Sequence, residues 1–145
     1  MQNDNNPALD SQRMMTKLKE DEFPRNDFQQ FLDEDIRSFF DELLESTGQQ
    51  KSDIIKKTNI DRTYGYQIFS GMRIAERDYY IRIAIAMSLD LRTTQRMLAV
   101  TKSSGLHPLI MRDAAIIFAI NHQYDYDTTY DFMLELGLEP LEKDI

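Results

Sequence analysis

The stretch IIKKTNIDRTYGYQIFSGMR, residues Ile54 to Arg73, decides how the middle of this chain folds. Its apolar residues predict two short helices, one from Ser52 through Lys57 and one from Arg62 to Ser70. Between them, Asn59 is the non-glycine residue that best tolerates the left-handed conformation of a tight turn. Gly71 directly after the second helix predicts a left-handed cap there. We therefore expect two helices joined by a tight turn.

The same stretch resembles the helix-turn-helix of the lambda-repressor-like, or Cro/XRE, family, whose pattern is close to LAxxxGvsxxxIsxxexGxr. The matched positions are Ile54, Ile55, Asn59, Ile60, Asp61, Ile68 and Gly71-Met72-Arg73. Asn59 takes the place of the family's turn glycine, and Asp61 takes that of a helix-capping serine. With supporting helices expected before and after it, the resemblance covers roughly Glu34 to Val100. It implies a DNA-binding helical bundle.

Two residues of the stretch depart from the family pattern. Ile55 is larger than the alanine usual at the helix crossing, and Gly65 stands where the family buries a branched apolar residue. A bulky residue can fill the space that a missing side chain leaves. We expect these two departures to compensate each other.

We expect the residues on the outward face of the second helix to read bases. They are Arg62, Thr63, Tyr66, Gln67 and Ser70. Arg and Gln side chains can make paired hydrogen bonds to base edges, and Thr offers both a hydroxyl and a methyl group. Lys51 and Arg73 stand near the ends of the unit, where a charge meets phosphates. The resemblance implies the same for Lys51, which occupies the position of a phosphate-contacting residue.

The charge of the chain is unevenly distributed. The 145 residues carry a net charge of -8, yet residues 48–112 hold eleven Lys/Arg against five Asp/Glu, a net of +6. Residues 1–47 and 113–145 each carry -7. The basic centre fits a double-stranded DNA partner despite the acidic total. The acidic flanks are expected to be solvated faces; alternatively, the N-terminal one folds over the basic centre and competes with DNA.

Composition and motifs exclude several classes of function. With no cysteine there is no disulfide framework or thiolate metal site, which suits a reducing cytoplasm. The N-terminus is polar and no apolar run approaches membrane-spanning length, so we expect a cytoplasmic protein with no membrane partner. His107 and His122 lack neighbouring ligands, so we expect no metal and no cofactor. The DYDTTYD run from Asp125 lacks the glycine and the distal glutamate of a calcium loop, so helix capping is expected there. No nucleophile–base pair is readable, and we expect no enzyme.

The rest of the chain also predicts helices, so we expect an all-α fold. Helical patterns cover Ala8–Lys19, Asp27–Leu32, Ile36–Leu44, Arg77–Met87 and Thr93–Val100. The segment from Arg77 also matches the segment from Arg112 without a gap, at an offset of 35 residues. Each half reads as a helix, a break with a capping Asp and a second helix; they are a repeat, or two hairpins with similar capping and packing needs.

These features predict three segments. Residues 1–32 are an acidic, partly helical or disordered extension, 33–104 a lambda-repressor-like helix-turn-helix domain, and 105–145 a helical hairpin packed on it. We expect a sequence-specific DNA-binding transcription regulator, a homodimer because one recognition helix reads little sequence alone. The alternative is a protein–protein interaction adaptor built on the same fold, which engages its partner through the acidic flanks and the C-terminal hairpin.

Overall fold

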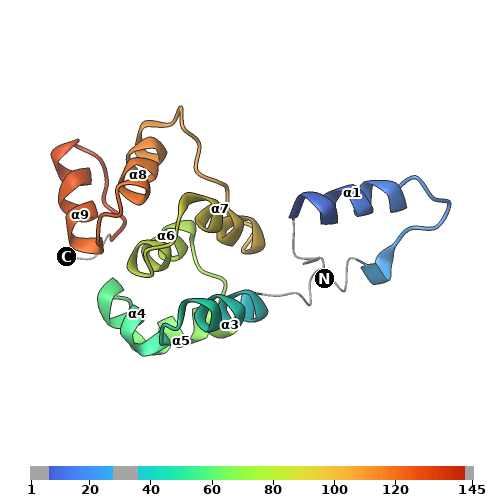
Figure 1. Ribbon diagram of the computed structural model, residues 1–145, viewed down its shortest axis with the longest axis horizontal. Coiled ribbons are helices and arrows are strands. Elements are labelled where there is room, and N and C mark those ends of the chain that lie inside the picture. The colour runs from blue at the N-terminus through green and yellow to red at the C-terminus, as the bar shows by residue number, and fades with distance from the viewer. Residues whose placement is uncertain (1–6, 28–35, 143–145) are drawn as a thin grey trace. The chain divides into compact units, whose positions relative to one another are not determined.

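The computed structural model describes residues 7–27 and 36–142, and every regular element within those ranges is a helix (Figure 1). This confirms the all-α class. The chain divides into two compact units, Met1–Asp35 and Ile36–Ile145. The boundaries predicted for the three segments stay predictions.

The first unit contains helix α1, Pro7–Lys17. It ends two residues earlier than predicted, where the N–H groups of Lys19 and Glu20 bond to carbonyls three residues back. The acidic run that follows is unfavourable at the negative end of a helix. Lys17 forms an ion pair with Asp27. Most of the helix predicted over Asp27–Leu32 lies outside the described residues.

The second unit consists of consecutive short helices. They are α3 (Ile36–Thr47), α4 (Lys51–Thr58), α5 (Arg62–Ser70), α6 (Arg77–Ala86), α7 (Leu91–Val100), α8 (Met111–Asn121) and α9 (Tyr126–Glu135). The bounds of α5 are those predicted. Helix α7 begins two residues before its predicted start because the side chain of Asp90 caps it, accepting a hydrogen bond from the N–H of Thr93.

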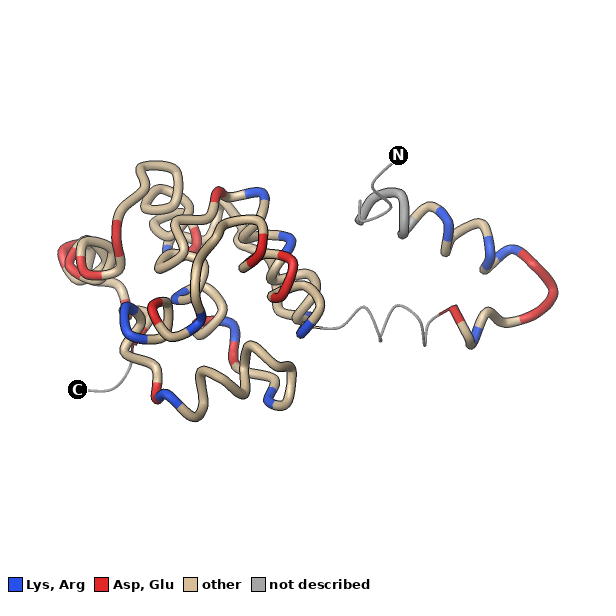
Figure 2. The backbone as a smooth tube through the Cα atoms, turned by 60° about the horizontal axis from the view of Figure 1, so that its bottom comes forward, with Lys and Arg blue, Asp and Glu red and all other residues tan. Residues whose placement is uncertain are grey.

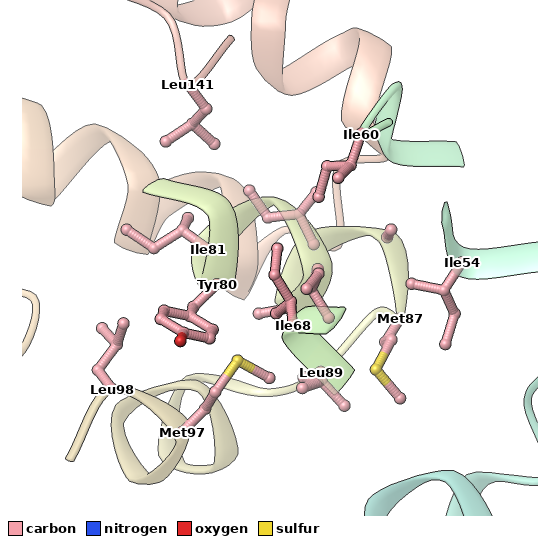
Figure 3. Close-up of a cluster of buried hydrophobic side chains, with 14 of the residues drawn as sticks. Ile54, Ile60, Ile68, Tyr80, Ile81, Met87, Leu89, Met97, Leu98 and Leu141 are labelled. Atoms are coloured by element: carbon pink, nitrogen blue, oxygen red, sulfur yellow. The ribbon is translucent and has the colours of Figure 1, made fainter. Parts of the chain in front are cut away.

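Helices α6 and α7 lie in the middle of the second unit, with α3, α4 and α5 on one side and α8 and α9 on the other (Figure 1). Figure 3 shows the buried side chains that join these elements, including Ile68 of α5, Tyr80 of α6 and Met97 of α7. The Phe40 ring of α3 meets the Phe69 ring of α5 edge to face, with centroids 4.8 Å apart. This packing fixes α5 against the core along one face.

The two hairpins, α6–α7 and α8–α9, repeat each other in backbone detail at the offset of 35 residues. Ser88 and Gln123 both adopt the left-handed conformation, with φ of 57° and 53°. Asp90 and Asp125 each accept a hydrogen bond of 2.8 Å from the N–H three residues later. The capping role predicted for the run from Asp125 is confirmed. Hydrogen bonds from the side chain and then the backbone N–H of Thr93 lower the pKa of Asp90, and those of Thr128 lower the pKa of Asp125, because a protonated carboxyl accepts them less well.

The hairpins also exchange ion pairs. Arg77 Nη2 lies 2.5 Å from Asp113 Oδ1, and Arg112 Nη2 lies 3.0 Å from Asp78 Oδ2. Since Arg77 corresponds to Arg112 and Asp78 to Asp113, each arginine pairs with the aspartate of the other hairpin. Each arginine also donates to two loop carbonyls of its own hairpin, Ser104 and Gly105 for Arg77 and Glu139 and Pro140 for Arg112. The ion pairs between the hairpins are thus reciprocal, and the loop contacts within them are equivalent. Similar capping needs alone do not require this pattern.

Asp113 is the more buried acid of the two reciprocal pairs. Burial raises its pKa, but hydrogen bonds from the Arg77 guanidinium and the His107 N–H, with the charges of Arg77 and Arg112, outweigh burial. Its pKa therefore lies below the usual value, and its charged form stabilises the contact between the hairpins.

Candidate nucleic-acid interface

The turn between α4 and α5 has the geometry predicted from its sequence. Asn59 ends α4 in the left-handed conformation, with φ 55° and ψ 21°. Asp61 caps α5, and its Oδ2 accepts a hydrogen bond of 3.1 Å from the N–H of Tyr64. Ile60 between them is buried, and Gly71 ends α5 in the left-handed conformation. Local contacts thus define the turn between α4 and α5, and Gly71 defines the far end of α5.

A buried arginine forms a hydrogen bond with the end of α4 at the same turn. Arg82 of α6 is 6% exposed, and its Nη2 donates a hydrogen bond of 2.6 Å to the carbonyl of Thr58, the last residue of α4. A cation suits the negative end of a helix. The guanidinium also lies 3.8 Å from Glu142 near the C-terminal end and stacks over the Tyr126 ring at 5.9 Å. Sequence reasoning missed Arg82, which stands within an apolar helix pattern.

Gly65 and Ile55 pack directly against each other where α4 crosses α5. A Cβ atom added at Gly65 would lie 2.8 Å from Ile55 Cγ1 and 2.9 Å from Cδ1. Both distances are shorter than carbon atoms approach without a shift in structure. The Ile55 side chain occupies the space that a side chain at Gly65 would need, so the predicted compensation is confirmed.

The predicted base-reading residues divide into two groups by exposure. Arg62, Thr63 and Tyr66 are exposed, whereas Gln67 and Ser70 are half-buried. The Arg62 guanidinium lies over the Tyr66 ring, 5.8 Å from its centroid, which holds the guanidinium along the open face of α5. The Ser70 hydroxyl donates to the Gln67 carbonyl at 3.1 Å and so helps to close the last turn.

Basic side chains flank this face. Lys51 at the start of α4 has its Nζ 4.0 Å from Asp41 of α3, and Arg73 is exposed beyond α5. Lys56 and Lys57, which were not among the predicted site residues, are exposed in the last turn of α4. Their signal in the sequence is the lysine pair before the turn. From residue 51 to 73, five Lys/Arg face two Asp, a net charge of +3.

A hollow of about 370 Å³ lies where α4 meets the start of α5. It is lined by Ser52, Ile55, Lys56, Asn59, Ile60, Asp61 and Arg62. Two of these side chains, Lys56 and Arg62, are cationic, and one, Asp61, is anionic. The hollow therefore offers a basic rim beside the exposed end of α5.

The described residues contain no group of three or more His, Cys, Asp or Glu side chains placed to hold a metal ion. Both histidines bond within their own segments: His107 Nδ1 accepts from the N–H of Leu109, and His122 Nδ1 lies 2.8 Å from the carbonyl of Phe118. In the same part of the chain, no helix has the length and apolar character needed to cross a membrane.

Comparison of the chain with models of protein families, with curated proteins and with solved structures found no match. The residues and their geometry therefore carry the functional argument.

Proposed function

We propose that α4, the turn at Asn59 and α5 form a helix-turn-helix of the lambda-repressor-like kind, and that this protein binds DNA through α5. The observation that carries the proposal is the two-sided character of α5. Ile68 and Phe69 are fully buried in the core, while Arg62 and Thr63 on the other side are exposed. An α-helix that is anchored along one face and polar along the other can be presented to a partner without unfolding.

The size and chemistry of α5 suit the major groove. A helix with its side chains measures about 10–12 Å across, and the groove is about 12 Å wide. In this arrangement Arg62 and Gln67 make hydrogen bonds to base edges, and Thr63 contacts a base through its hydroxyl or methyl group. Tyr66 holds Arg62 in place. Ser70 lies at the far end of the same face.

Phosphate contacts come from the basic residues around α5. Lys51 and Arg73 flank the face, and Lys56 and Lys57 extend it along α4. Such contacts release counterions from DNA, so the affinity falls steeply as salt concentration rises. The basic centre of the chain lets this attraction act locally, although the chain as a whole is acidic.

The experiment is a selection of random DNA duplexes on the full chain at low salt, followed by measurement of affinity against salt concentration. Gln67→Ala is expected to relax the preference at one base pair, a loss of about 1–3 kcal/mol on the selected sequence. Lys51→Ala is expected to weaken binding to all sequences and to reduce the salt slope by about one phosphate. Lys102→Ala is the matched control, because Lys102 is exposed in the loop after α7.

Two outcomes would overturn the proposal. One is no retention of any duplex at low salt, which would leave the adaptor function as the better explanation. The other is an equal, sequence-independent loss for Gln67→Ala and Lys51→Ala, which would remove Gln67 from base reading. Because one α5 contacts few base pairs, we also propose a homodimer on DNA, and sedimentation of the complex measures its stoichiometry.

A further inference from the structure

The first hairpin buries a set of positions whose equivalents in the second hairpin are exposed or half-buried. In α6–α7, Ile83, Met87, Leu89 and Met97 are all buried, and Figure 3 shows Met87, Leu89 and Met97 within the buried cluster of this unit. The equivalent positions of α8–α9 are Phe118, His122, Tyr124 and Phe132. Ile83 is 1% exposed, whereas Phe118 is 43% exposed. We call the four residues of α8–α9 the aromatic face.

The aromatic face is an ordered cluster rather than scattered apolar residues. The Phe118 ring stacks on His122 with centroids 3.9 Å apart and on Phe132 at 5.3 Å. Tyr124 meets Phe132 edge to face at 5.5 Å. Side chains that already hold one another lose little conformational freedom when a partner covers them, and aromatic residues are enriched at protein interfaces.

The first hairpin shows what covers this face. Helix α3 packs against α7 and α4 packs against α6, and Gln49, in the connection between α3 and α4, donates a hydrogen bond of 3.1 Å to the carbonyl of Met87. Arg96 of α7 lies over the Phe39 ring of α3, 5.4 Å from its centroid. On the α7 side of this hairpin, an amphipathic helix with aromatic side chains therefore forms part of the cover.

The charges around the aromatic face differ from those of the first hairpin. Asp127 and Asp131 stand on α9 at the positions that Arg92 and Arg96 occupy on α7. Both aspartates are exposed, and α9 carries acidic but no basic positions (Figure 2). From residue 113 to 142 the sequence contains no Lys or Arg. A helix that covers the aromatic face therefore lies beside Asp127 and Asp131, whereas α3 lies beside Arg96 on the first hairpin.

We propose that the aromatic face of α8–α9 docks a basic amphipathic helix of a partner protein. Its apolar stripe covers Phe118 and Phe132, and its Lys or Arg side chains meet Asp127 and Asp131. Charge decides between this occupant and a second copy of the chain packed face to face. The second copy would bring two acidic rims together, which opposes association.

The test uses two helical peptides of about 15 residues, a length at which isolated helices begin to persist. They share a Leu/Phe stripe; one carries Lys and the other Glu at the remaining positions. Each is titrated into the isotope-labelled full chain, and amide shifts map the contact while fluorescence anisotropy gives the affinity. We expect the lysine peptide to shift α8 and α9, and the glutamate peptide to leave them unchanged.

Three variants separate specific docking from attraction by charge. Phe118→Gln keeps a helix-compatible side chain and is expected to weaken the lysine peptide by about tenfold or more, the effect of losing one buried ring. Joint substitution of Asp127→Asn and Asp131→Asn is expected to weaken it as well, and since both residues are exposed, this variant folds. Met72→Gln removes an exposed apolar side chain elsewhere and is expected to have no effect.

Several results would overturn the proposal. Absence of binding by the lysine peptide, equal binding of both peptides, or an affinity unchanged by Phe118→Gln would each remove the aromatic face as a docking site for a basic helix. A dimer of the free chain in sedimentation that Phe118→Gln dissociates would assign the face to a second copy instead. None of these results bears on DNA binding by α5, which uses other residues.

Discussion

Replacing Gly65 by Ala tests whether the α4–α5 crossing depends on its mutual fit with Ile55. Alanine should gain about 1 kcal/mol over glycine from helix propensity. Its Cβ, however, would lie 2.8 and 2.9 Å from two carbons of a buried, β-branched side chain that has little room to turn. Overpacking of this kind costs about 1–3 kcal/mol. We expect Gly65→Ala alone to destabilise the protein by about 1 kcal/mol.

The companion substitution removes the larger partner. Ile55→Ala deletes a buried side chain, and such changes cost about 2–5 kcal/mol. In the double variant the alanine methyl at position 65 enters the space that Ile55 has left, so the clash disappears and the helix-propensity gain remains. We expect the double variant to be more stable than the sum of the single effects predicts, with a coupling free energy of about 2 kcal/mol.

Urea unfolding of the full chain, followed by circular dichroism, measures each free energy of unfolding. The matched control combines Gly65→Ala with Ile54→Ala. Ile54 is also buried on α4, but the three atoms nearest to a Cβ at Gly65 all belong to Ile55. That pair is expected to be nearly additive. Additivity within about 0.5 kcal/mol for Ile55 and Gly65 would refute the argument that these two residues fit each other.

Three further predictions concern the rest of the second unit. Asp125→Ala removes the cap of α9 and is expected to lower the midpoint of urea unfolding. Arg82→Met leaves the buried end of α4 at Thr58 without its donor and is expected to cost about 2 kcal/mol, measured by calorimetry. Asp113, whose folded pKa is lowered, contributes stability that is present above its unfolded pKa of about 4 and is lost as pH falls through the lower folded pKa. Asp113→Asn should therefore flatten the acid limb of stability against pH; an unchanged limb would show that this carboxyl does not contribute.

Local features of the α4–α5 turn could be predicted from the sequence because they depend on neighbouring residues. Asn59, Asp61 and Gly71 each satisfy a backbone requirement within a few positions of themselves, and all three act as predicted. The fit of Ile55 and Gly65 was predictable for a related reason. A residue larger than usual and a residue smaller than usual at one helix crossing indicate that the larger side chain fills the space left by the smaller one.

Contacts between distant segments could not be predicted in the same way. The offset of 35 residues aligns Arg77 with Arg112, yet the ion pairs join each arginine to the aspartate of the other hairpin. Similarity shows which residues are equivalent, whereas pairing depends on how the two hairpins face each other. Arg82 was hidden for another reason: a charged residue in an apolar helix gives no sign of the carbonyl that it will meet.

The reciprocal ion pairs also limit where a homodimer can form. Two identical hairpins facing each other across a two-fold axis would make this pattern, with each Arg77 meeting the Asp78 of the other hairpin. In this chain the second hairpin already occupies that face of the first, and Arg77 is paired with Asp113 instead. The face is therefore closed to a second copy unless α8–α9 detaches. If two α5 helices read half-sites about 34 Å apart, the contact between the two copies has to lie on another surface. The second hairpin instead stabilises the first within a single chain.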